Sequence, residues 1–266
     1  MPDEIFEVYR RQYSYDRRPL NAVVEAQEDA QFWRKETVVL DAAYGGERFR
    51  AYLYLPKNAS PPYQTIVYFP GGDARHLGSS RDASLSSTDF IIRSGRALLY
   101  PVYKGTYERA EPLSAGLQAA RELRIAWSRD LGRSIDYLET RQDIDHARIG
   151  FHFVSGSTGV ILSALEPRLK VSVLQASGLW GQPPPEIDPI NFAPRVRMPT
   201  LMVNGRYDFE LPVETSQRPL FDLLGTPPEH KRHAVLEGGH LPWRRQELVD
   251  EVLAWLDRYL GPVPPR

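Results

Sequence analysis

The sequence predicts an α/β protein with a mostly parallel central sheet, an antiparallel hairpin near the N-terminus and helices on both faces. Short apolar runs that stop at glycine, such as TIVYFPGGDA, are typical of buried parallel strands. Apolar residues at helical spacing follow, for example over residues 123–139. Strands that alternate with helices form right-handed crossovers, which cover both faces of a sheet.

The elements are expected in a regular order over one domain, residues 1–266. Residues 1–34 are expected to form a helical extension packed on this domain, and ETVVLDAA and ERFRAYLYLP alternate in polarity around a Gly45-Gly46 turn, which predicts the hairpin. Further strands are predicted in TIVYFPGGDA, RALLYPVY, ARIGFHFV, KVSVLQAS, TLMVNGRYD and HAVLEGGH. An amphipathic helix over residues 246–260 and a proline-rich tail over residues 261–266 complete the chain.

Composition excludes several classes of function. The 266 residues include 33 basic and 34 acidic side chains without a basic stripe, so neither nucleic acid nor a membrane is an expected partner. Cysteine is absent, which removes thiol nucleophiles and cysteine-ligated metals. The charged N-terminus lacks the apolar core of a signal peptide, and we expect a cytoplasmic protein.

Four loops that follow predicted strands carry the reactive side chains: PGGDA, SGSTG, NGRYD and EGGH. Loops at the carboxyl ends of parallel strands meet at one edge of the sheet. The order serine, aspartate, histidine along the chain is that of a large class of serine hydrolases. We therefore predict Asp208 as the orienting carboxylate and His240 as the base, with Glu210 as a weaker substitute for the acid.

The nucleophile is open between two serines of the SGSTG loop. A strained strand-to-helix turn favours small residues two positions before and after the serine, which suits Ser157 better than Ser155, because Phe153 precedes Ser155. Hydrolysis also needs N–H groups that stabilise an oxyanion. If Ser155 is the nucleophile, the expected donors are the N–H of Gly156 and that of Gly72 or Asp73.

Long stretches of the chain resemble a known group of enzymes. The matching segments include AYGGERFRAYLYLPKNASPPYQTIVYFPG, SGRALLYPVYKGTYER, DPINFAPRVRMPTLMVNGRYDFELPVETSQRPLFDLLGTPPEHKR and EGGH. They resemble bacterial α/β-hydrolases of the acetyl-xylan-esterase, dienelactone-hydrolase and prolyl-oligopeptidase-like clan, most of all hydrolase domains found alone or fused to bacterial serine/threonine kinases. The resemblance implies Asp208 as triad acid and His240 as triad base, because NGRYD and EGGH match directly.

The resemblance also gives a register for the serine. In this clan a D-x-x-R-I-G run opens the strand, and the resemblance places the nucleophilic serine six residues after the isoleucine. Here that run spans 145–150, and six residues past Ile149 is Ser155. Ser157 would extend the strand by about 6.6 Å, at roughly 3.3 Å per residue, so we choose Ser155 and keep Ser157 as the alternative.

The predicted function is that of a serine carboxylesterase acting on a small-molecule ester, without cofactor or metal. A prolyl-oligopeptidase-type peptidase is an alternative, because it uses the same triad. A non-catalytic binding or sensor module is another, because Phe153 stands where the family's turn carries glycine.

Overall fold

A single sheet of nine strands runs through the computed structural model, which describes residues 1–110, 116–241 and 245–264. The strand order is β1-β2-β3-β5-β4-β6-β7-β8-β9. Pairing from β1 to β5 is antiparallel, and pairing from β5 through β4 to β9 is parallel. The strands are β1 Val23–Asp29, β2 Trp33–Asp41, β3 Arg48–Pro56, β4 Tyr63–Phe69, β5 Ala97–Pro101, β6 Ile144–Val154, β7 Val171–Gln175, β8 Thr200–Gly205 and β9 Lys231–Leu236.

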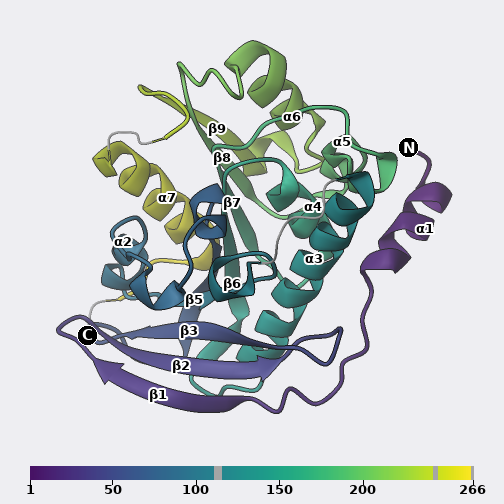
Figure 1. Ribbon diagram of the computed structural model, residues 1–266. Helices are drawn as coiled ribbons and strands as arrows, with labels where there is room; N and C mark the ends of the chain where they lie inside the picture. The colour runs from purple at the N-terminus through teal and green to yellow at the C-terminus, as the bar shows by residue number, and fades with distance from the viewer. Residues whose placement is uncertain (111–115, 242–244, 265–266) are drawn as a thin grey trace.

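Helices cover both faces of this sheet (Figure 1). The helices are α1 Asp3–Tyr13, α2 Asp89–Arg93, α3 Leu117–Glu139, α4 Thr158–Leu165, α5 Pro189–Phe192, α6 Arg218–Leu223 and α7 Arg245–Leu260. One apolar core joins α3, α4 and α6 to the strands, and a second core joins α2 and α7 to the opposite face. The prediction of a mostly parallel sheet between two helical layers, with an antiparallel β2–β3 hairpin, is confirmed.

The predicted helical extension over residues 1–34 is wrong beyond its first half. Helix α1 ends at Tyr13, and Val23–Asp29 forms the edge strand β1. All seven residues of β1 are exposed, so the strand is held by backbone pairing with β2 and by surface ion pairs such as Glu28 with Lys35 at 2.7 Å, without a buried side chain. A strand without a buried face has no alternation in hydrophobicity, which is why the sequence pattern did not indicate it.

The parallel strands are aligned so that the loops following them leave the sheet at a common edge. One row of register partners across the parallel strands consists of Phe69, Phe153, Leu174, Met202 and His233. The loops that carry the candidate residues begin within a few residues of this row. Among the described residues, no helix combines the length and the apolar character needed to span a bilayer.

Candidate active site

The turn between β6 and α4 presents Ser155 in a strained conformation. Strand β6 stays paired with β7 up to Val154, and the N–H of Ser155 still donates to the carbonyl of Gln175 at 2.8 Å. The chain then reverses: Ser155 has φ +67° and Gly156 has φ +89°. A non-glycine residue in the left-handed region is uncommon, and such strain concentrates at functional sites. The turn leaves the Ser155 side chain at the edge of the sheet.

Ser155, His240 and Asp208 are connected by hydrogen bonds. The Oγ of Ser155 lies 3.0 Å from Nε2 of His240, and Nδ1 of the same imidazole lies 2.8 Å from Oδ2 of Asp208. With the proton on Nδ1, the imidazole donates to the carboxylate and accepts the serine hydroxyl. Ser157 is instead the N-cap residue of α4. The structure therefore pairs Ser155, and not the alternative Ser157, with His240.

The carboxylate of Asp208 is held in place from its other side. Asp208 is 3% exposed, and its Oδ1 accepts the N–H groups of Glu210 at 3.0 Å and Leu211 at 2.8 Å. Oδ2 is left to face His240. Glu210, the substitute considered for the acid, lies on the opposite side of the ring, with Oε2 4.0 Å from Nε2. It cannot orient the imidazole as Asp208 does.

Glycines allow the loops after β8 and β9 to lie against each other. A Cβ on Gly205 would lie 1.9 Å from the carbonyl oxygen of Gly239, so only glycine fits there. Beyond the strands, Arg206 and Tyr207 donate N–H bonds to the carbonyls of Leu236 and Gly238 at 2.8 and 2.9 Å. This close pairing brings the loop that ends in His240 beside the loop that carries Asp208.

The loop after β4 passes directly over the serine. A Cβ on Gly71 would lie 3.3 Å from the Cβ of Ser155. The next residues, Gly72 and Asp73, open the 3₁₀ helix η1, Gly72–Arg75. The first N–H groups of such a helix have no acceptor within it. They are therefore suited to a negatively charged oxygen bound beside Ser155.

The backbone N–H of Gly156 has another partner. It donates to the carbonyl of Ala176 at 3.0 Å, so in this conformation it is not available to an oxyanion. Ala176 accepts this bond from a left-handed conformation of its own, with φ +49°. The expectation for Gly156 as an oxyanion donor is therefore not supported by the geometry. The physical reason is that the hydrogen bonds between this segment and the chain at the end of β7 continue past Ser155 to Gly156.

Phe153, which stands where the resembled hydrolases carry glycine, is accommodated by a glycine in α4. Phe153 is buried, and a Cβ on Gly159 in α4 would lie 2.7 Å from its ring. The space that a larger residue at 159 would need is therefore filled by the phenyl ring. The phenylalanine fits without displacing Ser155 from His240.

Tyr103 supports the loop over the serine, a role that the sequence pattern did not reveal. Its hydroxyl donates to the carbonyl of Pro70 at 2.6 Å, and its ring stacks on Phe69 with centroids 4.4 Å apart. Trp127 of α3 packs edge-on against the Tyr103 ring, with centroids 5.0 Å apart. The signal available in the sequence was an aromatic residue just after a buried strand, which is equally typical of a core residue.

His152 lies within the sheet below the turn. It is buried, its Nε2 lies 2.9 Å from Oε1 of Gln175, and burial lowers the pKa of His152 to about 4, against the opposing effect of the bond to Gln175. Such a histidine is neutral at physiological pH. It supports β7 where the Gln175 carbonyl holds Ser155, and it takes no part in the chain of hydrogen bonds to Asp208.

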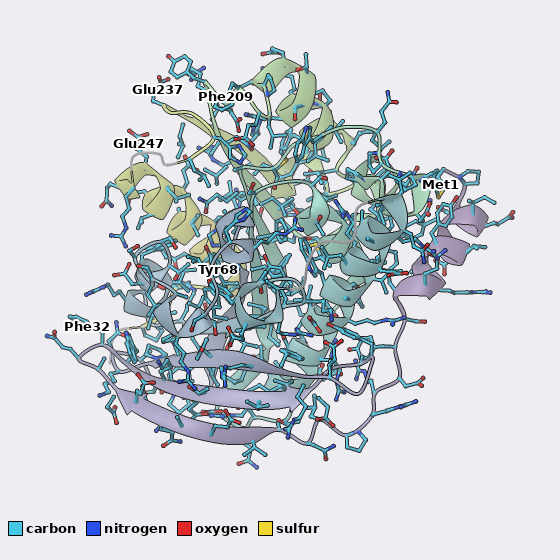
Figure 2. The ribbon with its side chains drawn as sticks, viewed as in Figure 1. Met1, Phe32, Tyr68, Phe209, Glu237 and Glu247 are labelled. Carbon is cyan, nitrogen blue, oxygen red and sulfur yellow. The ribbon has the colours of Figure 1, made fainter. Side chains whose placement is uncertain are left out.

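Two surface features complete the description of this end. Phe209, directly after Asp208, is 82% exposed and points away from the body of the molecule, as does Glu237 (Figure 2).

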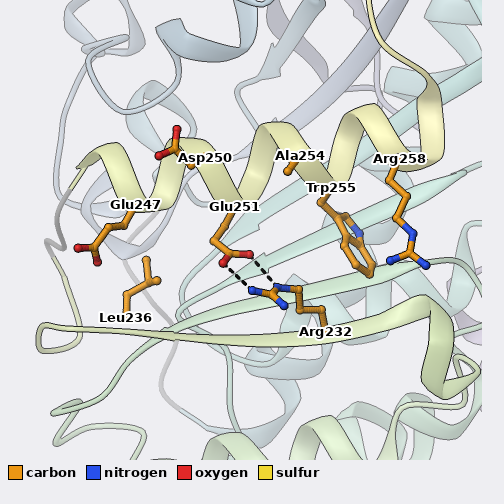
Figure 3. Close-up of a pocket in the computed structure, with 8 residues that line it drawn as sticks. All are labelled: Arg232, Leu236, Glu247, Asp250, Glu251, Ala254, Trp255 and Arg258. Atoms are coloured by element: carbon orange, nitrogen blue, oxygen red, sulfur yellow. Dashed lines mark hydrogen bonds and ion pairs between the residues drawn. The ribbon is translucent and has the colours of Figure 1, made fainter.

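A cavity of about 560 Å³ lies between β9 and α7, and across it Arg232 forms an ion pair with Glu251 at 2.7 Å (Figure 3). Its lining includes none of the three hydrogen-bonded residues, so this cavity is separate from the candidate active site.

Comparison with known proteins identifies the fold. No family model and no curated protein matches the sequence. Among solved structures, an acetyl xylan esterase from a Thermoanaerobacterium species superposes with a TM-score of 0.74 at 16% identity, over 96% of this chain and 93% of that one. An acetyl xylan esterase from a Paenibacillus species gives 0.73 at 18% identity, over 97% and 94%.

A putative dipeptidyl aminopeptidase IV from Bacteroides ovatus is also similar. It gives a TM-score of 0.67 at 17% identity, over 88% of this chain and 37% of that one. These likenesses show the α/β-hydrolase fold.

Proposed function

We propose that the protein is a serine hydrolase, a carboxylesterase that cleaves small acyl esters. The observation that carries the proposal is the pair of hydrogen bonds on either side of one imidazole, 3.0 Å from Ser155 Oγ to His240 Nε2 and 2.8 Å from His240 Nδ1 to Asp208 Oδ2. A hydroxyl is a weak nucleophile until a base within this distance accepts its proton.

In the proposed reaction, Ser155 Oγ attacks the ester carbonyl carbon while His240 Nε2 takes the hydroxyl proton. The carbonyl oxygen becomes negatively charged, and the N–H groups of Gly72 and Asp73 at the start of η1 stabilise it. Asp208 stabilises the imidazolium formed. The imidazolium then protonates the departing alkoxide, and an acyl-serine remains, which water hydrolyses by the same steps in reverse order.

The similarity to acetyl xylan esterases favours esters over amides. The superposed esterases match almost the full length of both chains, whereas the peptidase match spans 37% of that chain. A peptidase of the prolyl-oligopeptidase type remains the second candidate. It predicts that a prolyl amide is hydrolysed with a higher kcat/KM than the corresponding acetyl ester, and the esterase proposal predicts the reverse.

A non-catalytic sensor module is favoured by one observation, the bond from the Gly156 N–H to Ala176, which removes one expected oxyanion donor. The esterase proposal requires η1 to supply the donors or the turn to shift when substrate binds. A ligand that binds at the site with no serine labelled by a fluorophosphonate would support the sensor instead.

The test uses two matched serine variants. Ser155→Ala is expected to abolish both labelling by a fluorophosphonate and hydrolysis of 4-nitrophenyl acetate. Ser157→Ala, two residues away and outside the hydrogen-bond chain, is expected to keep labelling. Loss of labelling in Ser157→Ala with retention in Ser155→Ala would overturn the assignment of the nucleophile.

A further inference from the structure

Two arginines beside the proposed active site form no ion pair with a carboxylate of the described residues. Among arginines of the described residues that are not exposed, only Arg75, Arg124 and Arg129 form no ion pair with a carboxylate. Comparable buried guanidinium groups in this chain are paired: Arg109 with Asp130 at 2.8 Å is an example. A half-buried guanidinium with donors to spare is a ready site for an anion.

Arg75 is close to the proposed nucleophile through a short, defined segment. It is the last residue of η1, which starts directly after Gly71, and Gly71 lies against Ser155. A 3₁₀ helix rises about 2.0 Å per residue, so Arg75 lies about 6 Å along the helix from Gly72. The guanidinium therefore belongs to the loop that is proposed to bind the oxyanion.

Arg124 lies on α3, which packs against the loop after β5. Trp127, one turn further along this helix, donates from Nε1 to the carbonyl of Lys104 at 2.7 Å and packs on Tyr103. Residues three apart lie on one helix face, so Arg124 lies on the side of α3 that faces the loop after β5. Because α3 follows β5 and runs back toward the start of β6, Arg124 lies nearer than Trp127 to the edge of the sheet where Ser155 is.

The two positive charges act on each other. Burial lowers the pKa of Arg124; Tyr13 opposes this effect, and the charge of Arg75, the smallest of the three influences, lowers the pKa further. Arg75 also interacts electrostatically with Tyr103, whose hydroxyl holds the Pro70 carbonyl. Arg124 makes one side-chain hydrogen bond, from Nη1 to the carbonyl of Ala120 at 2.9 Å. Two like charges held together without a carboxylate are stabilised by an anion between them.

We propose that Arg75 and Arg124 form a subsite that binds a carboxylate group on the ester substrate, beside Ser155. This inference rests on the proposed function and names its substrate class: an ester whose acyl or alcohol part carries a carboxylate. Guanidinium groups suit this role because their planar set of donors matches the two oxygens of a carboxylate.

The test compares substrates that differ only in charge. In 4-acetoxybenzoate and 4-acetoxybenzamide the difference lies in the alcohol part; in methyl hydrogen adipate and the methyl ester of adipamic acid it lies in the acyl part. We expect the wild type to prefer the carboxylate in at least one pair by about a hundredfold in kcat/KM. The pair that shows the preference identifies the side of the ester that faces the arginines.

Charge-neutral variants then assign the preference to these residues. Arg75→Gln and Arg124→Gln should each lower the carboxylate-to-amide ratio by about tenfold, mainly through KM for the carboxylate. Arg81→Gln is the matched control, because Arg81 is an exposed arginine of the same segment between β4 and α2 and should keep the ratio. Ratios within twofold of one for the wild type in both pairs, or ratios unchanged in both Gln variants, would overturn the inference.

Binding measured without turnover separates this inference from the proposed function. Calorimetric titration of Ser155→Ala with 4-hydroxybenzoate and with adipate should show binding that Arg75→Gln or Arg124→Gln, added to Ser155→Ala, weakens about tenfold. If a fluorophosphonate labels no serine while this arginine-dependent binding is found, the proposed function fails and the anion subsite stands. If Ser155 is labelled and neither anion depends on the arginines, the subsite fails and the esterase stands.

Discussion

Two clusters in this molecule each combine a hydroxyl, a basic group and a buried aspartate, and they are built differently. Around Asp130, Tyr44 Oη donates to the carboxylate at 2.8 Å, Arg109 donates to it at 2.8 Å, and Arg109 also donates to Tyr44 Oη at 2.8 Å. Each member bonds to both of the others, so the cluster is closed. Around Asp208, the imidazole of His240 separates the carboxylate from the Ser155 hydroxyl.

The two clusters differ in whether a hydroxyl oxygen is left without a hydrogen-bond donor and can therefore react with a substrate. The closed cluster joins the loop after β5 to α3, because the N–H of Lys104 also donates to Asp130 at 2.8 Å. Its polar atoms are bonded to other groups of the protein. In the linear arrangement, the serine oxygen keeps lone pairs that no neighbouring donor occupies in the described hydrogen bonds. We infer that the closed cluster stabilises the fold and that the linear one performs chemistry, and four experiments test this contrast.

The largest effect is expected from removing the proposed base. His240→Ala should lower kcat/KM for 4-nitrophenyl acetate by about 10⁶-fold, and Asp208→Asn by about 10⁴-fold, because the imidazole then loses its orientation. Both variants should unfold near the wild-type temperature. Glu210→Gln, which changes a carboxylate on the other side of the ring, is the control and should stay within about tenfold. Substantial hydrolysis by His240→Ala would refute the linear arrangement as a catalytic unit.

Breaking the closed cluster should instead destabilise the fold. Asp130→Ala removes the nearer and fully buried carboxylate of Arg109, which keeps Glu47 at 3.2 Å, and should lower the free energy of unfolding by about 3–5 kcal/mol, measured by urea denaturation with tryptophan fluorescence. The folded fraction should still be labelled at Ser155. Glu214→Ala removes an exposed partner of Arg218 and should cost less than about 1 kcal/mol. Equal costs for the two variants would contradict the contrast between a buried and an exposed ion pair.

The buried histidine provides a pH test of the same contrast. Burial lowers the pKa of His152 to about 4, whereas an unfolded histidine titrates near 6.5, so below pH 6.5 the unfolded chain binds a proton that the folded chain excludes. This group should therefore reduce the free energy of unfolding as the pH falls from 6.5 to 4, by about 3 kcal/mol at the lower limit.

Comparison of His152→Gln with the wild type isolates this contribution. The variant should show a shallower loss of stability in urea denaturation between pH 7 and pH 4.5, because the other histidines, including His233, are present in both proteins. Parallel stability curves would show that His152 is not the group responsible.

The smallest effect is expected from Tyr103, which packs in the core and holds the loop over Ser155. Tyr103→Phe removes the hydroxyl that donates to Pro70 and should lower the free energy of unfolding by about 1 kcal/mol. If this bond positions the loop over Ser155, kcat should fall about tenfold with KM unchanged, since small displacements are costly at the reacting atoms. Tyr137→Phe, a buried tyrosine at the other end of α3, should leave kcat unchanged. A loss of stability without a change in kcat would make Tyr103 purely structural.

Much of this architecture could be predicted from local patterns. Apolar runs that end at glycine predicted the parallel strands, and the chain order of serine, aspartate and histidine predicted loops that meet at one edge. Strand β1 could not be predicted, because all of its residues are exposed and it is held by backbone bonds to β2 and by surface ion pairs, neither of which leaves a hydrophobic pattern. Arg75 and Arg124 are unremarkable in the sequence; Arg75 lies in η1 itself, and only the packing of α3 against the loop after β5 brings the segment that carries Arg124 to the same part of the molecule.

The sequence by itself determined which residue types follow which strands, because hydrophobic periodicity and glycine positions act over a few neighbouring residues. The choice between Ser155 and Ser157 depended on the tertiary structure. Neighbour sterics favoured Ser157, but Phe153 fits over Gly159, and pairing with β7 continues to Ser155, which brings its hydroxyl 3.0 Å from His240. Such a distance depends on contacts between segments 85 residues apart, and no local pattern contains that information.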